Sequence, residues 1–400
     1  MLWKVESGST PSPRVRASSR LQKIMRSFLA RRALLSAAAT AMVFGTGGVP
    51  PALAAGNVPA SAMAASEELP RALKLHSGAL MPLNGLGTWE AAPGVVGEAV
   101  KASIAAGCRH IDCAPVYKNE PEVGEAITAC GVPREELWVT SKLWNDRRRP
   151  EDVRNALDRT LRDLRTDYVD LYLIHWPVVW AKDSVMRPDR KASLREAWQT
   201  MEALVDEGKC RNIGISNFKQ SEVEDVLSYA RIKPAVNQVE LHPRLPQTEL
   251  VTFCQKSGIA VTAYSPLGRG DVKKAGMLSS PTVQQIATTH GVSPASVLLR
   301  WNMQRGVAVI PKSANPARVA QNAREPWSFA LSADEIGALS TLEDGGRFCT
   351  APWSTFDDRT TQDKLLSSTL TGVASAVFSV VSLDVMGAGR EMLHLRTFDM

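Results

Sequence analysis

Four side chains that could carry out acid–base chemistry stand at or just beyond the ends of predicted β-strands. Asp112, Lys142 and His175 each end a short apolar run, and Tyr117 follows Asp112 by five residues. A phenol has a pKa of about 10, but a nearby ammonium stabilises the phenolate, and a carboxylate fixes the ammonium in turn. We therefore expect Tyr117 to donate a proton, Lys142 to lower the pKa of Tyr117, and Asp112 to orient Lys142.

The fourth group, His175, indicates what receives the proton. A neutral imidazole can hydrogen-bond a carbonyl oxygen and position the substrate. The set offers no nucleophile and no spacing typical of metal ligands, so it favours hydride transfer from a cofactor. Taken singly, Lys142 or Asp112 would more commonly form a structural ion pair and His175 a core contact. All four in register on consecutive strands favour a catalytic site.

An alternating pattern of strands and helices must bring these groups together. Short β-branched runs alternate with stretches of period 3.6, which is typical of parallel β-α units. The predicted strands are Leu83–Gly87, His110–Asp112, Leu137–Lys142, Val169–His175, Ile213–Ser216, Val236–Glu240, Ala260–Tyr264 and Val307–Pro311. Predicted helices between them include Gly94–Ala106, Pro150–Leu164 and Leu194–Glu207. Eight such units indicate a closed (β/α)8 TIM barrel, whose active site lies at the carboxyl ends of the strands.

The alternative architecture is an open, doubly wound sheet of the kind that binds dinucleotides. That fold holds the pyrophosphate with a G-x-G-x-x-G loop after a strand, and no predicted strand here is followed by one. The barrel is therefore favoured, and a dinucleotide would have to be bound by residues other than a G-x-G-x-x-G loop.

Several motifs resemble those of the aldo-keto reductases, from about Leu73 to Trp353. They include HIDCAPVYKNE, LWVTSKLWN, DLYLIHWP, NIGISNF, AVNQVELHP, VTAYSPLG and VIPKSANPARVAQN, in the order that is usual in the family. The resemblance implies an α/β protein with a (β/α)8 TIM barrel, an N-terminal β-hairpin, and non-barrel extensions at both ends. It also implies an NADPH-dependent aldehyde or aldose reductase whose acid is Tyr117. The family's four catalytic positions coincide with the set chosen above from chemistry alone.

The same resemblance assigns residues to NADPH. They are Ser216, Asn217, Gln238, Tyr264, Ser265, Leu267, Lys312, Ser313, Arg318, Gln321 and Asn322. The first three would bind the carboxamide, Tyr264 would stack on the nicotinamide ring, and Ser265 and Leu267 would line the pyrophosphate path.

The remaining assignments concern the adenosine end of the cofactor. Lys312, Ser313 and Arg318 would hold the 2′-phosphate, which suits charge-assisted donors, so NADPH is expected over NADH. Asn322 matches an adenine-contacting asparagine, whereas Gln321 stands where the family usually has Glu.

Tryptophans cluster after three of the predicted strands. They are Trp89, Trp144, Trp176 and Trp180. A tryptophan is ordinarily a core residue, but at strand ends beside the proposed acid these rings would form the walls of an apolar slot. The expected substrate is a small-molecule aldehyde or ketone with alkyl or aryl groups. A cofactor-binding sensor on the same fold, with vestigial turnover, is the alternative function.

The cysteines indicate neither a disulfide framework nor a zinc site, because the six are scattered and none forms a C-x-x-C pair. No metal is expected. Cys113 stands where the family usually has Thr or Ser, and an oxidation-sensitive thiol is conceivable there. A buried, inert cysteine is the favoured interpretation. The segment Gly268–Pro281 is short compared with the belt that covers the cofactor in some family members.

The charge is concentrated at the front of the chain. The net charge is +6, and residues 1–60 alone carry +7, so the body is near neutral and no nucleic-acid partner is expected. Arg31 and Arg32 precede an apolar run over Ala33–Phe44 and a small-residue site at Ala52–Ala54. This order indicates a targeting leader over residues 1–66, to the plastid and, through a twin-arginine signal, to the thylakoid lumen. Cytoplasm and bacterial periplasm are the alternatives.

The expected domain organisation is therefore a leader over 1–66, a barrel over 67–358 and an extension over 359–400. The uncharged run Leu365–Leu383 is nearly long enough to cross a bilayer, but seven of its 19 residues are Ser or Thr. We predict no membrane span, and we expect a monomer.

Overall fold

The computed structural model describes residues 69–184, 186–268, 276–351 and 353–354. The predicted leader, the predicted extension with its apolar run, and residues 269–275 of the segment Gly268–Pro281 lie outside the described residues. Among the described helices, none is both long and apolar enough to span a membrane.

Eight parallel strands form the central sheet, and their order in space follows their order in the chain. The strands are β3 (Leu86–Gly87), β4 (His110–Asp112), β5 (Trp138–Leu143), β6 (Leu171–Ile174), β7 (Ile213–Ser216), β8 (Val236–Glu240), β9 (Ala260–Tyr264) and β10 (Val307–Val309). All eight correspond to predicted strands, and several are shorter than predicted.

Backbone hydrogen bonds between the first and last strands close the sheet into a barrel. The N–H of Gly85 donates to Val309 O at 2.8 Å, the N–H of Val309 donates to Leu83 O at 2.9 Å, and the N–H of Gly87 donates to Pro311 O at 3.1 Å. Leu83 and Gly85 thus belong to the barrel although β3 begins only at Leu86. The (β/α)8 fold is confirmed.

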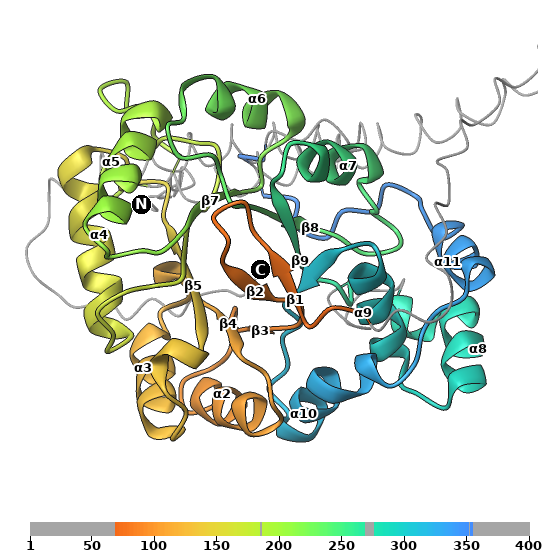
Figure 1. Cartoon of the computed structure of the whole chain (residues 1–400). Coiled ribbons are helices and arrows are strands. Elements are labelled where there is room, and N and C mark those ends of the chain that lie inside the picture. Colours follow the sequence, from red (N-terminus) through yellow and green to blue (C-terminus); the bar gives the residue numbers. More distant parts are fainter. Residues whose placement is uncertain (1–68, 185, 269–275, 352, 355–400) are drawn as a thin grey trace, which may run out of the picture. The chain divides into compact units, whose positions relative to one another are not determined.

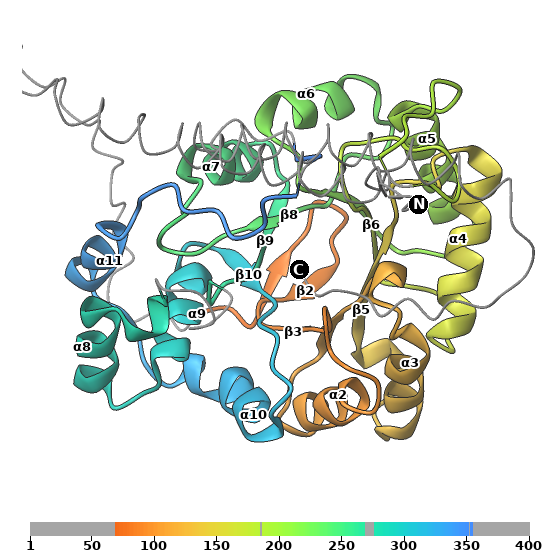
Figure 2. The same cartoon turned by 180° about the vertical axis from the view of Figure 1, so that it is seen from behind.

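Helices surround the strands as an outer ring (Figures 1 and 2). They are α2 (Val96–Ala105), α3 (Glu120–Ala129), α4 (Pro150–Asp163), α5 (Leu194–Asp206), α6 (Gln220–Tyr229), α7 (Thr248–Lys256), α8 (Pro281–His290), α9 (Pro294–Gln304), α10 (Pro316–Arg324) and α11 (Ala333–Ser340). Helix α4 shows why they pack inward: Val153, Leu157 and Leu161 recur at a spacing of four residues and are buried.

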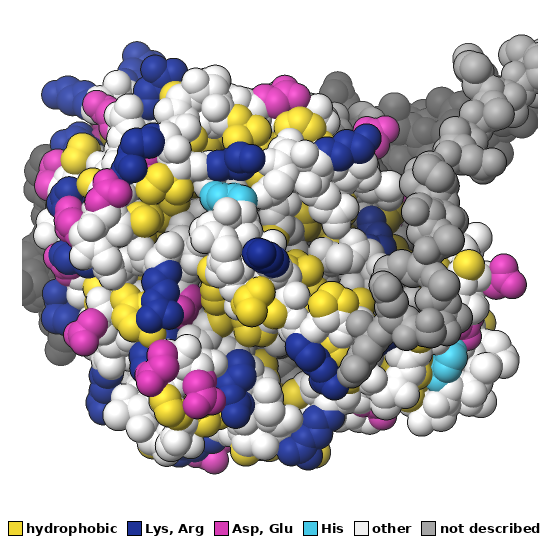
Figure 3. Space-filling model, in the orientation of Figure 1, with side chains coloured by type: hydrophobic (Ala, Val, Ile, Leu, Met, Phe, Trp, Pro, Cys, Tyr) yellow, Lys and Arg dark blue, Asp and Glu magenta, His cyan; other side chains and the backbone are white. Residues whose placement is uncertain are grey.

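A hairpin of β1 (Ala72–Lys74) and β2 (Leu80–Pro82) covers the amino ends of the barrel strands. Ser77 Oγ donates to Asn212 Oδ1 at 2.6 Å, just before β7, and His76 Nε2 lies 3.0 Å from Lys233 O, just before β8. The hairpin occupies the middle of the ring in Figure 1, and Figure 3 shows apolar side chains at the middle of that face. Leu80, at its edge, is 64% exposed.

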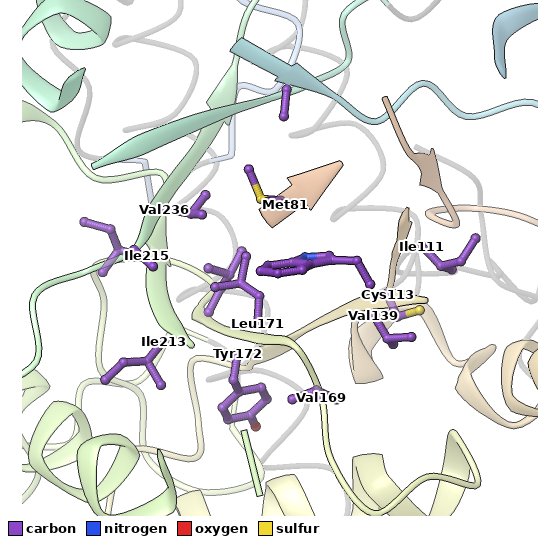
Figure 4. Packing of buried hydrophobic residues seen from close by; sticks show 14 of the residues in the cluster. Met81, Ile111, Cys113, Val139, Val169, Leu171, Tyr172, Ile213, Ile215 and Val236 are labelled. Carbon is purple, nitrogen blue, oxygen red and sulfur yellow. The ribbon is translucent and has the colours of Figure 1, made fainter. Parts of the chain in front are cut away.

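The main core lies inside the barrel and between the strands and helices. Met81 from the hairpin is fully buried together with strand residues such as Ile111, Val139 and Ile215 (Figure 4). Because the hairpin and this core fill the amino end, the carboxyl ends of the strands are the place for a site.

Candidate active site

Three of the four predicted acid–base residues form one hydrogen-bonded group at the carboxyl ends of β4 and β5. Lys142 Nζ donates to Asp112 Oδ1, to the carbonyl oxygen of Cys113 at 2.9 Å, and to Tyr117 Oη at 3.3 Å. Gln238 Nε2 donates to the other oxygen of Asp112 at 2.7 Å. The side chain at position 142 is therefore held by a carboxylate that is itself fixed from across the barrel.

Strand pairing and a sharp turn bring these residues together. β4 and β5 pair in parallel, so Asp112, the last residue of β4, and Lys142, one residue before the end of β5, lie at the same end of neighbouring strands. The 3-10 turn η1 (Pro115–Tyr117) follows, and Lys118 takes a left-handed conformation with φ of 57° at its end. This turn folds the chain back so that Tyr117 reaches Lys142.

The ammonium of Lys142 is buried and stays charged. Burial alone opposes the charged form, but the carboxylate of Asp112 and the hydroxyl of Tyr117 outweigh that effect and raise the pKa of Lys142 above its ordinary value. The buried ion pair therefore supplies a permanent positive charge beside the phenol.

The phenol of Tyr117 is less acidic than expected from the sequence. Burial raises the pKa of Tyr117 to about 12, although the charge of Lys142 acts to lower it. The expected effect of Lys142 is thus present but does not dominate, because burial disfavours the phenolate more strongly. At neutral pH Tyr117 holds its proton, as a general acid must.

His175 lies beside Tyr117 just after β6 (Leu171–Ile174). The two rings are 6.0 Å apart between centroids and nearly perpendicular. Burial, followed by the charges of Lys142 and Arg148, lowers the pKa of His175 well below its ordinary value. The imidazole is therefore neutral, as predicted, and its Nδ1 has no hydrogen-bond partner among the described residues.

The predicted carboxamide-binding residues form a continuous group with His175. Tyr264 Oη donates to Asn217 Oδ1 at 2.8 Å, and Asn217 Nδ2 donates to His175 O at 2.9 Å. Ser216 Oγ donates to the carbonyl oxygen of Gln238 at 2.8 Å. The structure therefore brings the predicted nicotinamide residues next to the acid–base group.

A second set of predicted cofactor residues lies along β9, β10 and the start of α10. Ser265 has a φ of 47° and begins a turn in which the N–H of Gly268 donates to its carbonyl oxygen at 2.9 Å, with Leu267 partly buried between them. Lys312 Nζ donates to Glu90 O at 3.2 Å, and Arg318 Nε lies 3.5 Å from Ser313 Oγ.

The last two predicted cofactor residues lie further along α10. Gln321 Nε2 donates to Glu325 Oε1 at 3.2 Å. Asn322 is buried, and its carbonyl oxygen accepts a hydrogen bond from Asn84 Nδ2 at 2.8 Å.

The donors at the start of α10 suit a phosphate. Among the described residues, neither Lys312 nor Arg318 forms an ion pair with a carboxylate. Both side chains are exposed, Arg318 lies next to the hydroxyl of Ser313, and Lys312 directly precedes Ser313 in the chain. Two cations without a carboxylate partner and a hydroxyl are a donor set for a phosphoryl group.

Three of the predicted tryptophans meet a fourth that the sequence analysis did not assign. Trp353 packs edge-to-face on Trp180, Trp176 and Trp144, with centroid distances of 5.0, 6.1 and 6.4 Å. Trp144 also packs edge-on against His175 at 4.9 Å. We call Trp144, Trp176, Trp180 and Trp353 the aromatic cluster. Strand ends revealed the first three, whereas Trp353 follows no strand and carries no such signal.

Trp89, the fourth predicted wall residue, lies after β3 and is 37% exposed.

The thiol of Cys113 is fully buried, and burial, followed by the charges of Glu120 and Asp112, raises the pKa of Cys113 well above its ordinary value. A thiol of this kind is unreactive, which agrees with the favoured interpretation of an inert cysteine.

The chain is similar in sequence to known aldo/keto reductases. A profile of the aldo/keto reductase family matches residues 84–344. Aldo-keto reductase family 1 member A1 from Pongo abelii is 46% identical over 291 residues, which cover 68% of this chain and 89% of that protein. The protein of the same name from Homo sapiens is 45% identical over 303 residues, covering 71% and 93%.

A solved structure gives the same result for the fold. The structure of the aldose reductase from Schistosoma japonicum has a TM-score of 0.66 and 40% sequence identity, and the match covers 72% of this chain and 98% of that one. The family profile includes all four acid–base residues and ends before Trp353.

Proposed function

The chain belongs to the aldo/keto reductase family, and on that premise we propose that it reduces aldehydes and ketones to alcohols with NADPH. The observation that carries this proposal is the hydrogen-bonded group in which Lys142 Nζ contacts both Asp112 and Tyr117, with the neutral ring of His175 beside the phenol.

The residues of the chain fit the proposed cofactor at both of its ends. Ser216, Asn217 and Tyr264 adjoin the acid–base group, and Lys312 and Arg318 offer cations without carboxylate partners among the described residues. When bound, the reduced nicotinamide supplies a hydride to the carbonyl carbon. The phosphate donors favour NADPH over NADH, because only NADPH carries the 2′-phosphate.

The side chains of this protein would then bind the carbonyl oxygen of the substrate and protonate it. Neutral His175 donates an N–H to that oxygen and fixes the plane of the carbonyl group. Tyr117 gives its hydroxyl proton to the same oxygen as negative charge develops there. The ammonium of Lys142 stabilises the phenolate that remains, and Asp112, itself held by Gln238, keeps the ammonium in place.

The aromatic cluster would receive the part of the substrate that does not react. Tryptophan rings beside the carbonyl site favour apolar alkyl or aryl groups over charged ones. They also shield the polar groups from water, which strengthens the hydrogen bonds to the carbonyl oxygen.

Turnover assays test the proposal directly. NADPH consumption, followed by its absorbance, should depend on an added aldehyde such as benzaldehyde. Tyr117→Phe should lower kcat by about a hundredfold or more, because it lacks the proton, while NADPH affinity stays the same. Tyr168→Phe, at the opposite end of the barrel, is the matched control. Tight NADPH binding without turnover of any carbonyl would instead favour a cofactor-binding sensor.

We further propose that residues 1–66 are a targeting leader, on the basis of the basic residues, the Arg31-Arg32 pair and the apolar run that follows. Amino-terminal sequencing of the mature protein from fractionated plastids would test this. A mature chain that begins at Met1 would reject it.

A further inference from the structure

The carboxylate of Glu240 is an unusually well-bound buried charge that takes no part in the chemistry proposed above. It stands at the carboxyl end of β8 and is 0% exposed. His242 Nε2 lies 3.1 Å from Oε1, the N–H of Phe348 donates to Oε1 at 2.7 Å, and the N–H of Cys349 donates to Oε2 at 2.9 Å. The guanidinium of Arg347, which is 2% exposed, lies 3.8 Å from Oε2.

Three of these four partners of the carboxylate, two N–H donors and one ion-pair partner, come from one segment, residues 344–349, which we call the C-terminal strap. The strap follows α11 and belongs to no helix or strand. Its backbone N–H groups therefore have no ladder to join, and buried N–H groups need an acceptor. Glu240 supplies one oxygen to each of two consecutive N–H groups. An ion pair between Arg244 and Asp344 also holds the start of the strap to the loop that follows β8.

The acceptor is rigidly placed because it belongs to the barrel. Residues 238 and 240 are two apart on one strand, so their side chains lie on the same face of the sheet. Gln238 reaches Asp112 from that face. Burial alone would raise the pKa of Glu240, but the hydrogen bond from His242 and the strap donors keep it below its ordinary value, so the carboxylate is ionised at neutral pH.

The strap leads directly to the aromatic cluster. Trp353 is four residues beyond Cys349, and four residues can span at most about 14 Å. Fixing the backbone at Cys349 therefore limits where Trp353 can lie. The observed place is against Trp180, Trp176 and Trp144, the last of which contacts His175. Figure 2 shows the blue segment after α11 running toward the strand ends.

We propose that Glu240 is a positioning residue for substrate selection: its carboxylate fixes the C-terminal strap, and the strap holds Trp353 in the aromatic cluster as a wall for the non-reacting group of the carbonyl substrate. This inference rests on the proposed carbonyl reduction. It assigns the binding of large aromatic aldehydes to the influence of a buried carboxylate that would touch neither the substrate nor the cofactor.

The inference separates binding of large substrates from chemistry. A large aromatic aldehyde reaches Trp353 and loses that contact when the strap is released, so its KM rises while its kcat is largely kept. A small aldehyde such as propanal reacts at the same carbonyl site without reaching Trp353. Loss of a single apolar contact of this kind is worth about tenfold in specificity.

The test compares Glu240→Gln, Glu240→Ala and Trp353→Ala with the wild-type protein, in assays with 2-naphthaldehyde, propanal and NADPH. We expect all three variants to raise the KM for 2-naphthaldehyde about tenfold, with changes below about twofold for propanal and NADPH. The double variant Glu240→Ala with Trp353→Ala should be no worse than Trp353→Ala alone, because both changes remove the same contact. Glu249→Gln, an exposed glutamate on α7, is the matched control.

Hydrogen exchange supplies a readout that does not require turnover. The amides of Phe348 and Cys349 should exchange faster in the Glu240 variants and remain protected in Trp353→Ala. Equal losses for both aldehydes, or an unchanged KM for 2-naphthaldehyde in Trp353→Ala, would overturn the inference even if the Glu240 variants fail to fold. If the wild-type protein turns over neither aldehyde, the proposed function itself is refuted. This outcome differs from those that overturn only the role of Glu240.

Discussion

Two opposing effects at Tyr117 decide how this residue could act as an acid. Burial raises the pKa of Tyr117 to about 12, and the neighbouring Lys142 acts against that rise. A sequence identifies the partners of a side chain, but the degree of burial depends on the packed structure. The types and order of Tyr117, Asp112, Lys142 and His175 were therefore predictable, whereas the net direction of the phenol's pKa was not.

The two pKa shifts predict the pH dependence of the proposed reaction. A raised pKa of Tyr117 keeps the phenol protonated until the pH approaches that value, and a lowered pKa of His175 keeps the imidazole neutral at acidic pH. Since kcat/KM reports the ionisation of the free enzyme, its value for aldehyde reduction should be nearly constant between about pH 6 and 9.

The rate of the reverse reaction, in contrast, should depend on pH. Alcohol oxidation needs the phenolate of Tyr117 as a base, so its rate should rise with pH through the same range. Steady-state profiles in both directions measure this. A marked fall in the reduction profile between about pH 6 and 8 would show that another group titrates there.

At the scale of single elements, the start of α10 is where selection between the two nicotinamide dinucleotides is expected. Arg318 lies in the first turn of α10, whereas Arg324 ends the helix and donates to Ala105 O and Ala106 O at 3.2 and 3.1 Å. Arg318→Ala should raise the KM for NADPH about tenfold or more and leave the KM for NADH nearly unchanged. Arg324→Ala is the control on the same helix. If Arg318→Ala changed the KM for NADPH and for NADH equally, the assignment of Arg318 to the 2′-phosphate would be wrong.

Two loops that carry three members of the aromatic cluster, Trp144 on one and Trp176 and Trp180 on the other, are joined by one buried guanidinium. Arg148 is 1% exposed and donates to Leu143 O and Asn145 Oδ1 on its own side. It also donates to Trp176 O at 2.9 Å and to Val178 O at 3.2 Å, both in the loop that follows β6. Burial lowers the pKa of Arg148 to about 9, so the buried charge is costly even though the guanidinium stays protonated at neutral pH, and the structure depends on these neutral acceptors to satisfy its N–H groups.

Removal of that guanidinium should loosen both loops. Arg148→Met fills a similar volume but leaves several buried oxygen atoms without donors, so we expect a loss of about 3 kcal/mol in the free energy of unfolding. Urea denaturation measures the change. Arg154→Met removes a half-exposed ion pair with Glu207 and should cost about 1 kcal/mol or less. Similar losses for the two variants would mean that water replaces the guanidinium of Arg148.

At the scale of the whole molecule, the part of the fold that repeats is the part that a sequence reveals. Most barrel strands are short apolar runs, many of them rich in β-branched residues, and polar residues end or follow them, so the strands and the residues they position could be predicted. The strap and Trp353 follow no such rule, because a side chain on a distant strand, Glu240, fixes them. Long-range contacts of this kind leave no local periodicity in the chain.

A second buried carboxyl links three elements of the barrel and should influence the stability of the whole molecule. Glu120, the first residue of α3, is 1% exposed. It accepts hydrogen bonds from Ser141 Oγ of β5 at 2.6 Å and from Thr160 Oγ1 of α4 at 3.2 Å. Burial raises the pKa of Glu120 to about 7. No cation contacts this carboxyl among the described residues, so the ionised form is disfavoured in the folded state.

The stability of the protein should therefore depend on pH through Glu120. A carboxyl with a raised pKa in the folded state is neutral below the unfolded value of 4.5, and it destabilises the fold increasingly as the pH rises toward 7. A shift of this size corresponds to about 3 kcal/mol. Glu120→Gln cannot ionise, so relative to the wild type its free energy of unfolding should improve by roughly that amount between pH 5 and pH 8. Denaturant titrations at the two pH values measure this, with the exposed Glu125→Gln as control. A difference between Glu120→Gln and wild type that stays constant with pH would show that Glu120 ionises freely in the folded protein.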